Sequence, residues 1–233
     1  MLNLSLLPDL QYNGGPALPP QKDDLEFLYQ TVTSMRATTV LEFGCGYSTF
    51  VIAQALKENK TWFDALPIRP EVRNSKMFTG FSVDTNKDWL RECNKKINGI
   101  NYFLSSCIVG LFLGQLCHNF ISLPDIVPDF IYIDGPDPAQ VIGDINGMTF
   151  SNCPERTPMA ADILIMESTL LPGTRILIDG RTNNARFLQR NLKRPWKCVE
   201  LTDQDVTLME LVEPPLGNII ANGPDILRWL KNR

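Results

Sequence analysis

One short segment, which joins an apolar strand to a helix, constrains the fold of this chain most strongly. Val40-Leu41 leads into Glu42-Phe43-Gly44-Cys45-Gly46-Tyr47-Ser48-Thr49, and a helical pattern follows directly. Glycine allows a sharp turn and lets a ligand approach where a Cβ atom would clash. The following helix offers free N–H groups and the positive end of its dipole. The segment therefore predicts a site for a nucleotide-like ligand at a strand–helix turn.

The rest of the chain alternates between strand and helix patterns. We expect strands at 38–43, 81–84, 102–104, 130–134 and 175–179, and helices at 23–35, from 48 onward, and at 87–97, 160–170 and 183–192. Such alternation is typical of a parallel, doubly wound sheet with helices on both faces. Two late strands, near 197–201 and 206–212, predict an antiparallel hairpin. The expected fold is α/β, with a mostly parallel seven-stranded sheet.

The expected organisation is an arm followed by one domain. Residues 1–22 are rich in Pro and Gly and predict an irregular N-terminal arm. Residues 23–233 would form a single Rossmann-like domain, whose first helix Asp23 or Asp24 would cap. The polar stretch 57–79 predicts an insertion before the second strand. Loops of that length usually carry function or an extra element.

Composition excludes several classes of protein. A hydrophobic content of 44% excludes general disorder, and a formal net charge of −4 argues against a broad nucleic-acid-binding surface. The six cysteines form no C-x-x-C pair, which is typical of reduced thiols, and the single histidine, His118, has no ligand cluster around it for zinc. No apolar run is long enough to span a membrane. We expect a cytoplasmic protein with no nucleic-acid or membrane partner, and a homodimer remains open.

Four of the five expected parallel strands end in a carboxylate. These residues are Glu42, Asp84, Asp134 and Asp179, whereas the remaining strand ends in Leu104-Ser105-Ser106. Ligands of open parallel sheets bind outside the carboxyl ends of the strands, near the switch in strand order. The acids are therefore expected to surround a ligand site at one edge of the sheet.

The glycine pattern distinguishes between nucleotide ligands. A dinucleotide fingerprint reads G-x-G-x-x-G, and Thr49 stands in place of its third glycine after Gly44 and Gly46. An NAD(P)-dependent oxidoreductase remains an alternative. The chain shows no evident Tyr/Lys or His proton-donor motif for that chemistry.

In these elements the chain resembles the class I S-adenosylmethionine-dependent methyltransferases. Glu42-x-Gly44-x-Gly46 looks like their motif I, and Val83-Asp84 matches the acidic end of their second strand. The segment from Asp129 to Pro136 is similar to their fourth motif, and Leu171 to Asp179 to the turn and strand that follow. The resemblance covers roughly residues 25–212. It implies S-adenosylmethionine as the cofactor and methyl transfer as the activity.

The resemblance also implies roles for individual residues. Gly44 and Gly46 would pass the methionine part of the cofactor, Glu42 would help to hold its amino group, and Asp84 would bind the ribose hydroxyls. Asp64 is the alternative ribose ligand, because it lies at the usual spacing of roughly 20 residues from the glycines. Either Ser105 or Ser106 would lie near the adenine. The predicted cofactor-binding residues are Glu42, Gly44, Gly46, Ser48, Asp84, Ser106 and Asp134.

The acceptor is expected to be a small molecule. Asp134-Gly135-Pro136-Asp137 does not match the Asn/Asp-Pro-Pro-Tyr/Phe of many N-methyltransferases, and with Asp179-Gly180-Arg181 it looks more like small-molecule or sugar O-methyltransferases. Methylation of a hydroxyl requires removal of a proton. Asp134, Asp179 and Arg181 are therefore the predicted catalytic residues. Arg181 would bind an acidic acceptor or pair with Asp134.

Two further questions are open at this stage. Asp134 and Asp179 stand where some O-methyltransferases of this fold hold Mg²⁺ or Ca²⁺, and Asn183 or Asn184 would add an oxygen ligand. Alternatively, these acids cap turns or bind cofactor and substrate, since Gly180 stands where an Asn ligand is expected. A lid over the acceptor would come from the arm or from 57–79. A non-catalytic relative, which keeps the fold as an interaction module, is a third alternative.

Overall fold

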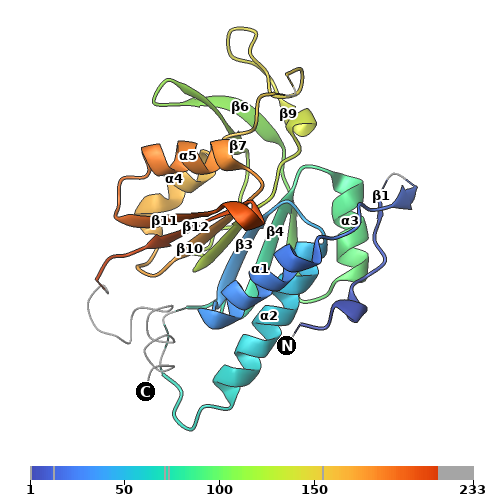
Figure 1. Ribbon diagram of the computed structural model, residues 1–233, viewed down its shortest axis with the longest axis vertical. Helices are drawn as coiled ribbons and strands as arrows, with labels where there is room; N and C mark the ends of the chain where they lie inside the picture. Colours follow the sequence, from blue (N-terminus) through green and yellow to red (C-terminus); the bar gives the residue numbers. More distant parts are fainter. Residues whose placement is uncertain (1, 13, 71, 73, 154, 215–233) are drawn as a thin grey trace.

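A central seven-stranded sheet organises the chain (Figure 1). The computed structural model describes residues 2–12, 14–70, 72, 74–153 and 155–214. The strand order is β11-β12-β10-β8-β3-β4-β5; the strands from β10 to β5 are parallel, and β12 is antiparallel to both of its neighbours. The predicted α/β fold with its closing hairpin is confirmed. The strands are β3 Thr39–Phe43, β4 Thr79–Asp84, β5 Ile100–Leu104, β8 Phe130–Ile133, β10 Arg175–Asp179, β11 Trp196–Leu201 and β12 Val206–Leu211.

Both faces of this sheet are covered. Successive side chains of a strand point to opposite faces, so Phe130 and Tyr132 pack with α1 and α2, whereas Ile131 and Ile133 pack on the side of α4 and α5. Strands buried on both faces are apolar throughout, which explains the continuous apolar runs of the sequence. The helices are α1 Lys22–Ser34, α2 Tyr47–Asp64, α3 Lys87–Lys96, α4 Asp162–Met166 and α5 Thr182–Asn191.

A second, three-stranded sheet packs against the main core, and the sequence did not predict it. It consists of β6 (Cys107–Phe112), β7 (Gln115–Phe120) and β9 (Val141–Ile142). The loop between β6 and β7 is Leu113-Gly114, and both residues have positive φ, at 49° and 77°. Such two-residue loops usually carry Asn-Gly or Asp-Gly. The apolar first residue hid the turn, so the region looked like one continuous apolar stretch.

The connection expected at 57–79 is shorter than predicted. Helix α2 continues to Asp64, so the connection to β4 spans only residues 65–78. The first prolines after the motif, Pro67 and Pro70, lie beyond this helix, and proline is what most strongly ends a helix. The polar residues of 57–64 therefore belong to a long helix, in which Lys57, Lys60, Thr61 and Asp64 are exposed and Asn59 is buried.

The N-terminal region also differs in detail from the prediction. The N-cap of α1 is Gln21, and neither Asp23 nor Asp24 caps it; both lie in the first turn, where a carboxylate favours the helix dipole. The arm contains a 3₁₀ turn and a two-stranded ladder, β1 (Gln11–Tyr12) with β2 (Gly15–Pro16). The last part of the predicted domain, 215–233, lies outside the described residues. Within the described part, no helix is long and apolar enough to cross a membrane.

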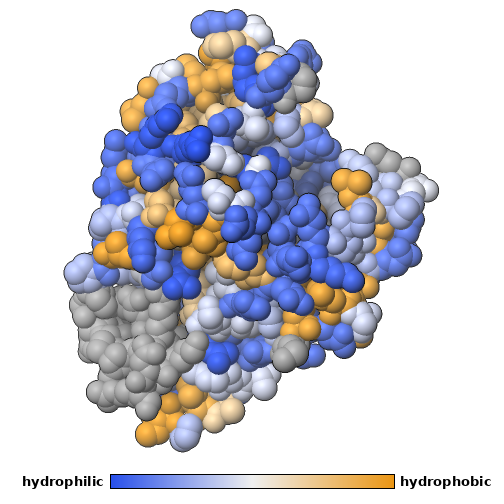
Figure 2. All heavy atoms as spheres, in the orientation of Figure 1, coloured by the Kyte–Doolittle hydropathy of each residue, from blue (hydrophilic) through white to orange (hydrophobic). Residues whose placement is uncertain are grey.

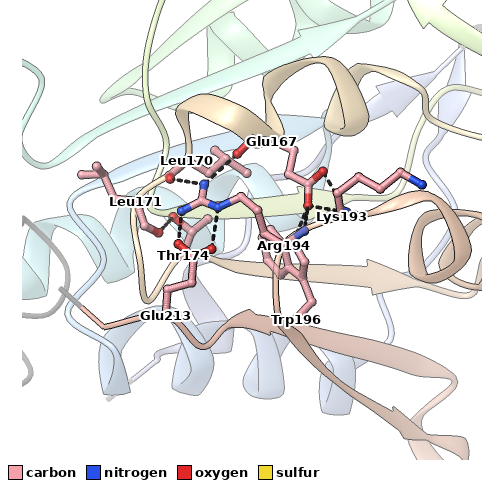
Figure 3. A network of polar contacts seen from close by, with 8 residues as sticks. All are labelled: Glu167, Leu170, Leu171, Thr174, Lys193, Arg194, Trp196 and Glu213. Atoms are coloured by element: carbon pink, nitrogen blue, oxygen red, sulfur yellow. Dashed lines mark hydrogen bonds and ion pairs between the residues drawn. The ribbon is translucent and has the colours of Figure 1, made fainter. Parts of the chain in front are cut away.

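A polar network fixes the closing hairpin to the sheet (Figure 3). The buried Glu167 carboxylate accepts hydrogen bonds from the backbone N–H groups of Lys193 and Arg194 and from the indole of Trp196. The Arg194 guanidinium donates to the carbonyl oxygens of Glu167 and Leu170, and it also forms an ion pair with Glu213. The predicted helix at 160–170 ends here as α4 and a 3₁₀ turn, Glu167–Thr169. The network thus links the start of β11 to the segment that precedes β10.

Candidate functional site

A cavity of about 840 Å³ opens at the carboxyl ends of the parallel strands. It lies where the chain order reverses, between β3 and β8, as expected for an open parallel sheet. Known ligand pockets measure about 300–1,000 Å³, so this cavity has room for a cofactor and a small second ligand. In the view of Figure 2, hydrophilic residues predominate over the middle of the molecule. Apolar residues gather at the upper left, over the β6–β7 hairpin.

Two glycines bring the ends of β3 and β8 into direct backbone contact. Gly44 has a φ of +92°, and a Cβ atom built on it would lie 3.1 Å from the backbone nitrogen of Gly135. A Cβ atom on Gly135 would lie 2.8 Å from both the nitrogen and the Cα of Gly44. Neither position accepts a side chain without movement of the other strand end. This contact forms the floor of the cavity at the switch point.

The acid of the motif organises the turn from beneath. Glu42 is 2% exposed, and it is not among the described residues that line the cavity. Its carboxylate accepts hydrogen bonds from the hydroxyls of Ser48 (2.6 Å) and Thr49 (2.7 Å). The Thr49 hydroxyl in turn accepts from the backbone N–H of Gly46 at 2.9 Å. The residue that replaces the third glycine therefore links the acid to the turn.

Burial also changes the ionisation of Glu42. Loss of hydration raises the pKa of this carboxyl to about 7, although the hydrogen bonds from Ser48 and Thr49 act in the opposite direction. The carboxyl therefore changes its charge near neutral pH. A direct contact between Glu42 and the cofactor's amino group stays a prediction, whereas Gly44, Gly46 and Ser48 line the cavity.

Asp84 joins the glycine turn to the end of β4. Its carboxylate accepts hydrogen bonds from the backbone N–H groups of Cys45 (3.0 Å) and Asn86 (2.7 Å), and it lines the cavity. Burial raises the pKa of Asp84. Asp64, the alternative ribose ligand, is exposed at the last residue of α2 and pairs with Lys60. An 18-residue helix is about 27 Å long, so Asp64 lies far from the turn. Of these two acids, Asp84 lines the cavity, and its contact with the ribose stays a prediction.

The sequence did not reveal two aromatic residues of the site, Tyr12 and Trp89. The indole N–H of Trp89, on α3, donates to the carbonyl oxygen of Cys45 at 2.6 Å. Tyr12, from the arm, packs edge-on against Trp89 with ring centroids 5.4 Å apart, and its hydroxyl accepts from Asn86 at 3.2 Å. Both aromatic residues line the cavity. The arm thus forms one wall, whereas no described residue of 57–79 lines the cavity. A lid over the acceptor stays a prediction.

The predicted catalytic acids lie on the other side of the switch point. Asp134 follows β8 and Asp179 ends β10, and both line the cavity. Loss of hydration, and secondly the charge of Asp179, raises the pKa of Asp134 to about 6. The Asp134 side chain is still 54% exposed. The Asp179 carboxylate accepts a hydrogen bond of 2.5 Å from the buried Tyr132 hydroxyl. Burial, and then the charges of Asp134 and Asp179, raises the pKa of Tyr132, so this phenol stays protonated and orients Asp179.

Arg181 stabilises the loop after β8. Its terminal nitrogens donate to the carbonyl oxygens of Asp134 (2.6 Å) and Pro136 (3.1 Å). One terminal nitrogen lies 3.9 Å from Oδ1 of Asp134, and Nε is buried. The guanidinium is thus bound to the protein, as in the expected pairing with Asp134. Its Nε has no hydrogen-bond partner, and Arg181 lines the cavity, so the binding of an acidic acceptor stays a prediction.

The remaining predicted residues lie elsewhere. Ser106 is exposed and, like Ser105, is not among the described residues lining the cavity. Thr85 and Gln140, which are hydrogen-bonded to each other, occupy the neighbouring part of the wall. Asn184 is buried and accepts from the backbone N–H of Ala160.

These contacts do not fit a divalent cation. In the described ranges, no group of three or more His, Cys, Asp or Glu side chains is arranged to hold a metal ion. Of the two predicted ligands, Asp179 already accepts from Tyr132, and Asp134 lies beside the Arg181 guanidinium. A positive charge already stands next to the donor set, and Asn184 is directed elsewhere. The alternatives, that these acids cap turns or bind cofactor and substrate, stay predictions.

Comparison with known proteins gives distant structural similarities only. No protein-family model matches the chain, and no curated protein matches it. An O-methyltransferase from Bacillus cereus, in complex with SAH, is 15% identical, with 85% of this chain and 84% of that chain covered and a TM-score of 0.45. The O-methyltransferase TomG from Streptomyces achromogenes, in complex with SAM, is 13% identical, with 85% of this chain and 84% of that chain covered and a TM-score of 0.43. An SAH-bound methyltransferase from Podospora anserina is 12% identical, with 84% of this chain and 80% of that chain covered and a TM-score of 0.49. Likeness at this level assigns no activity to the chain.

Proposed function

We propose that this protein transfers a methyl group from S-adenosylmethionine to a hydroxyl group of a small molecule. One observation carries the proposal: the glycine turn, Asp84 and Asp134 line a single cavity at the switch point of the sheet. The turn and Asp84 supply the shape and the acceptors for a nucleoside with an amino-acid tail. The cofactor would lie over β3 and β4, with its sulfonium above the contact between Gly44 and Gly135. The acceptor would lie over β8 and β10.

The chain's own groups account for the chemistry of transfer. Methyl transfer from a sulfonium requires in-line approach of the acceptor oxygen, which the cavity provides by positioning. The acceptor's proton must leave, and a carboxylate with a pKa of about 6 is largely ionised at pH 7 and can take it. Asp134 is therefore the general base of the proposal. Asp179, oriented by Tyr132, would hold the acceptor.

Isothermal titration with S-adenosylhomocysteine tests the cofactor assignment. The wild type should bind this product, and Asp84→Asn should weaken binding at least about tenfold, because a charged acceptor of two hydroxyl donors is lost. Asp64→Asn is the matched control, an exposed acid at the other end of α2, and should bind like the wild type. Thermal melting of both variants separates loss of binding from loss of fold. No binding by native wild type would overturn the proposal.

The same titration with NAD distinguishes the oxidoreductase alternative. Thr49 is fully buried, and its hydroxyl bridges Gly46 and Glu42, so the third glycine of the dinucleotide fingerprint has been replaced by a structural link. We expect no NAD binding at millimolar concentration. Tighter binding of NAD than of S-adenosylhomocysteine would favour the oxidoreductase, and binding of neither would favour a non-catalytic module.

A further inference from the structure

Buried polar atoms without a hydrogen-bond partner gather at one wall of the cavity. Among the described residues, six buried side-chain nitrogen and oxygen atoms have no partner, and five of these six belong to His118, Thr157, Arg181 and Asn184. Thr157 and Arg181 line the cavity, whereas His118 and Asn184 are fully buried. Because buried polar groups are nearly always paired, these four side chains indicate a place where a polar group of a ligand binds.

Hydrogen bonds bring these four residues together from three segments of the chain. The backbone of His118, in β7, exchanges two hydrogen bonds with the segment 157–161, at 2.8 and 2.9 Å. The Oδ1 atom of Asn184, in α5, accepts from the backbone N–H of Ala160 in the same segment at 2.9 Å. Arg181 is the N-cap of α5 and lies about one turn before Asn184. The group therefore stands where β7, the segment 157–161 and the start of α5 meet.

The unpartnered atoms of this group are mostly hydrogen-bond donors. The Nε–H group of Arg181 and the side-chain amide nitrogen of Asn184 can only donate, and the hydroxyl of Thr157 can also donate. The Arg181 side chain is 17% exposed, and its ion pair with Asp134 measures 3.9 Å, which is at the outer limit for such a contact. Charge-assisted hydrogen bonds to a carboxylate are among the strongest that a guanidinium makes. A site with these donors therefore fits an anionic oxygen group.

The surroundings of His118 agree with this interpretation. Burial, and then the positive charge of Arg181, lowers the pKa of His118 to about 3, so the imidazole is neutral at neutral pH and keeps one donor and one acceptor nitrogen. Its ring lies edge-on to that of Phe120, with ring centroids 6.4 Å apart, and Phe120 lines the cavity. The imidazole thus lies behind this wall, in a corner where the dominant charge is that of a cation.

We propose that the methyl acceptor is a hydroxy acid, whose carboxylate binds at the wall formed by Thr157 and Arg181 and supported from behind by His118 and Asn184. This inference rests on the proposed function and specifies its substrate class. The Nε–H group of Arg181 and the hydroxyl of Thr157 would donate to the carboxylate. The acceptor's hydroxyl would face Asp134, whose carbonyl oxygen accepts from a terminal nitrogen of Arg181. The same guanidinium would therefore hold the carboxylate of the acceptor and position the base that takes its proton.

The single histidine of the chain provides the measurement. In the untagged protein, His118 gives the one histidine Cε1–H signal of a proton–carbon NMR spectrum, so the signal needs no assignment. Three phenols with different tails are titrated into protein saturated with S-adenosylhomocysteine: 3-(4-hydroxyphenyl)propanoate is anionic, 3-(4-hydroxyphenyl)propanamide has the same shape without the charge, and tyramine is cationic. The propanoate should shift the His118 signal and bind at least about tenfold more tightly than either other probe, the effect of a charge-assisted hydrogen bond.

The other outcomes of this titration contradict the inference. Equal affinities of the propanoate and the propanamide, tighter binding of tyramine, or a His118 signal that does not respond to the propanoate would overturn it. S-adenosylhomocysteine carries a carboxylate of its own, so it is also titrated alone. If it shifts the His118 signal by itself and the propanoate adds nothing, the wall belongs to the cofactor, and the assignment to the acceptor is wrong.

A pair of variants locates the preference. Thr157→Val keeps the shape of the side chain and removes its hydroxyl, so it should reduce the affinity for the propanoate at least about threefold. Thr182→Val is the matched control, because Thr182 is exposed next to Arg181 and is not among the described lining residues. An unchanged affinity in Thr157→Val contradicts the inference. Failure of the proposed function is distinguishable, since it appears earlier, as absence of S-adenosylhomocysteine binding by the wild type.

Discussion

At the scale of single residues, Glu42 links the ionisation of the motif to the stability of the fold. Its folded-state pKa of about 7 lies above its ordinary value of 4.5. A group of this kind contributes stability that is fully present below pH 4.5 and is lost as the pH rises through about 7. The stability is lost because the buried carboxylate becomes charged in the folded state without a cationic partner.

This shift predicts how Glu42→Gln changes the pH dependence of unfolding. Between pH 4.5 and 8, the free energy of unfolding of the wild type should fall relative to the variant by roughly 3 kcal/mol. Other buried acids, such as Asp162, whose pKa burial raises to about 7, titrate in both proteins and cancel in the difference. Urea denaturation at several pH values measures it. Parallel curves for the two proteins would show that Glu42 titrates normally.

The residues of the site differ in how far the sequence revealed them. Gly44, Asp84 and Asp134 stand at strand ends, and parallel strands bring such positions together, so local pattern was enough to group them. Tyr12 and Trp89 meet across 77 positions of the chain, and no local pattern encodes that contact. Ser106 was placed in the site by its position after β5, but the chain turns there into β6 and carries the side chain outward.

At the scale of elements, periodicity predicted those that pack in the usual way. The five parallel strands and the closing hairpin follow from apolar runs and polar links. The β6–β7 hairpin escaped because Leu113 carries a positive φ that its residue type disfavours. Helix α2 was cut short in the prediction because its last two turns are polar, and a polar face is compatible with either a helix or a loop.

The network of Figure 3 is expected to support the fold and not the site. Glu167→Ala removes the acceptor of three N–H donors and should lower the free energy of unfolding by about 2–4 kcal/mol. Glu200→Ala, on β11, is the control, because the printed contact of Glu200 is an exposed ion pair of 3.7 Å with Arg186. It should cost at most about 1 kcal/mol. Denaturation measures both values. A change in S-adenosylhomocysteine affinity in Glu167→Ala at a temperature where it is folded would contradict a purely structural role.

At the scale of the whole molecule, the sheet topology divides the cavity into two parts. The chain first forms β3, β4 and β5 on one side, then returns to form β8 and β10 on the other. The glycine turn belongs to the first group, and Asp134 and Asp179 follow strands of the second. The proposed donor and acceptor therefore meet at the one place where strands from both groups are neighbours.

The N-terminal arm completes this arrangement from outside the sheet, which gives a prediction for Tyr12. Leu10 is fully buried with Cys93 and Ile97 of the α3 region, so the arm is fixed and Tyr12 is held against Trp89. Tyr12→Ala should weaken S-adenosylhomocysteine binding by roughly 2- to 10-fold, the equivalent of an aromatic contact of about 0.5–1.5 kcal/mol. Its melting temperature should stay close to that of the wild type, because Tyr12 is 38% exposed.

Leu6→Ala provides the control for this prediction, since Leu6 lies in the same arm, is 61% exposed and is not among the described lining residues. Calorimetric titration should find its affinity equal to that of the wild type. If both variants weaken binding equally, the arm acts through its general attachment to α3. If neither does, the arm only borders the cavity, and the cofactor is held by the strand ends alone. A loss confined to Tyr12→Ala means that a segment outside the sheet contributes directly to the cofactor site.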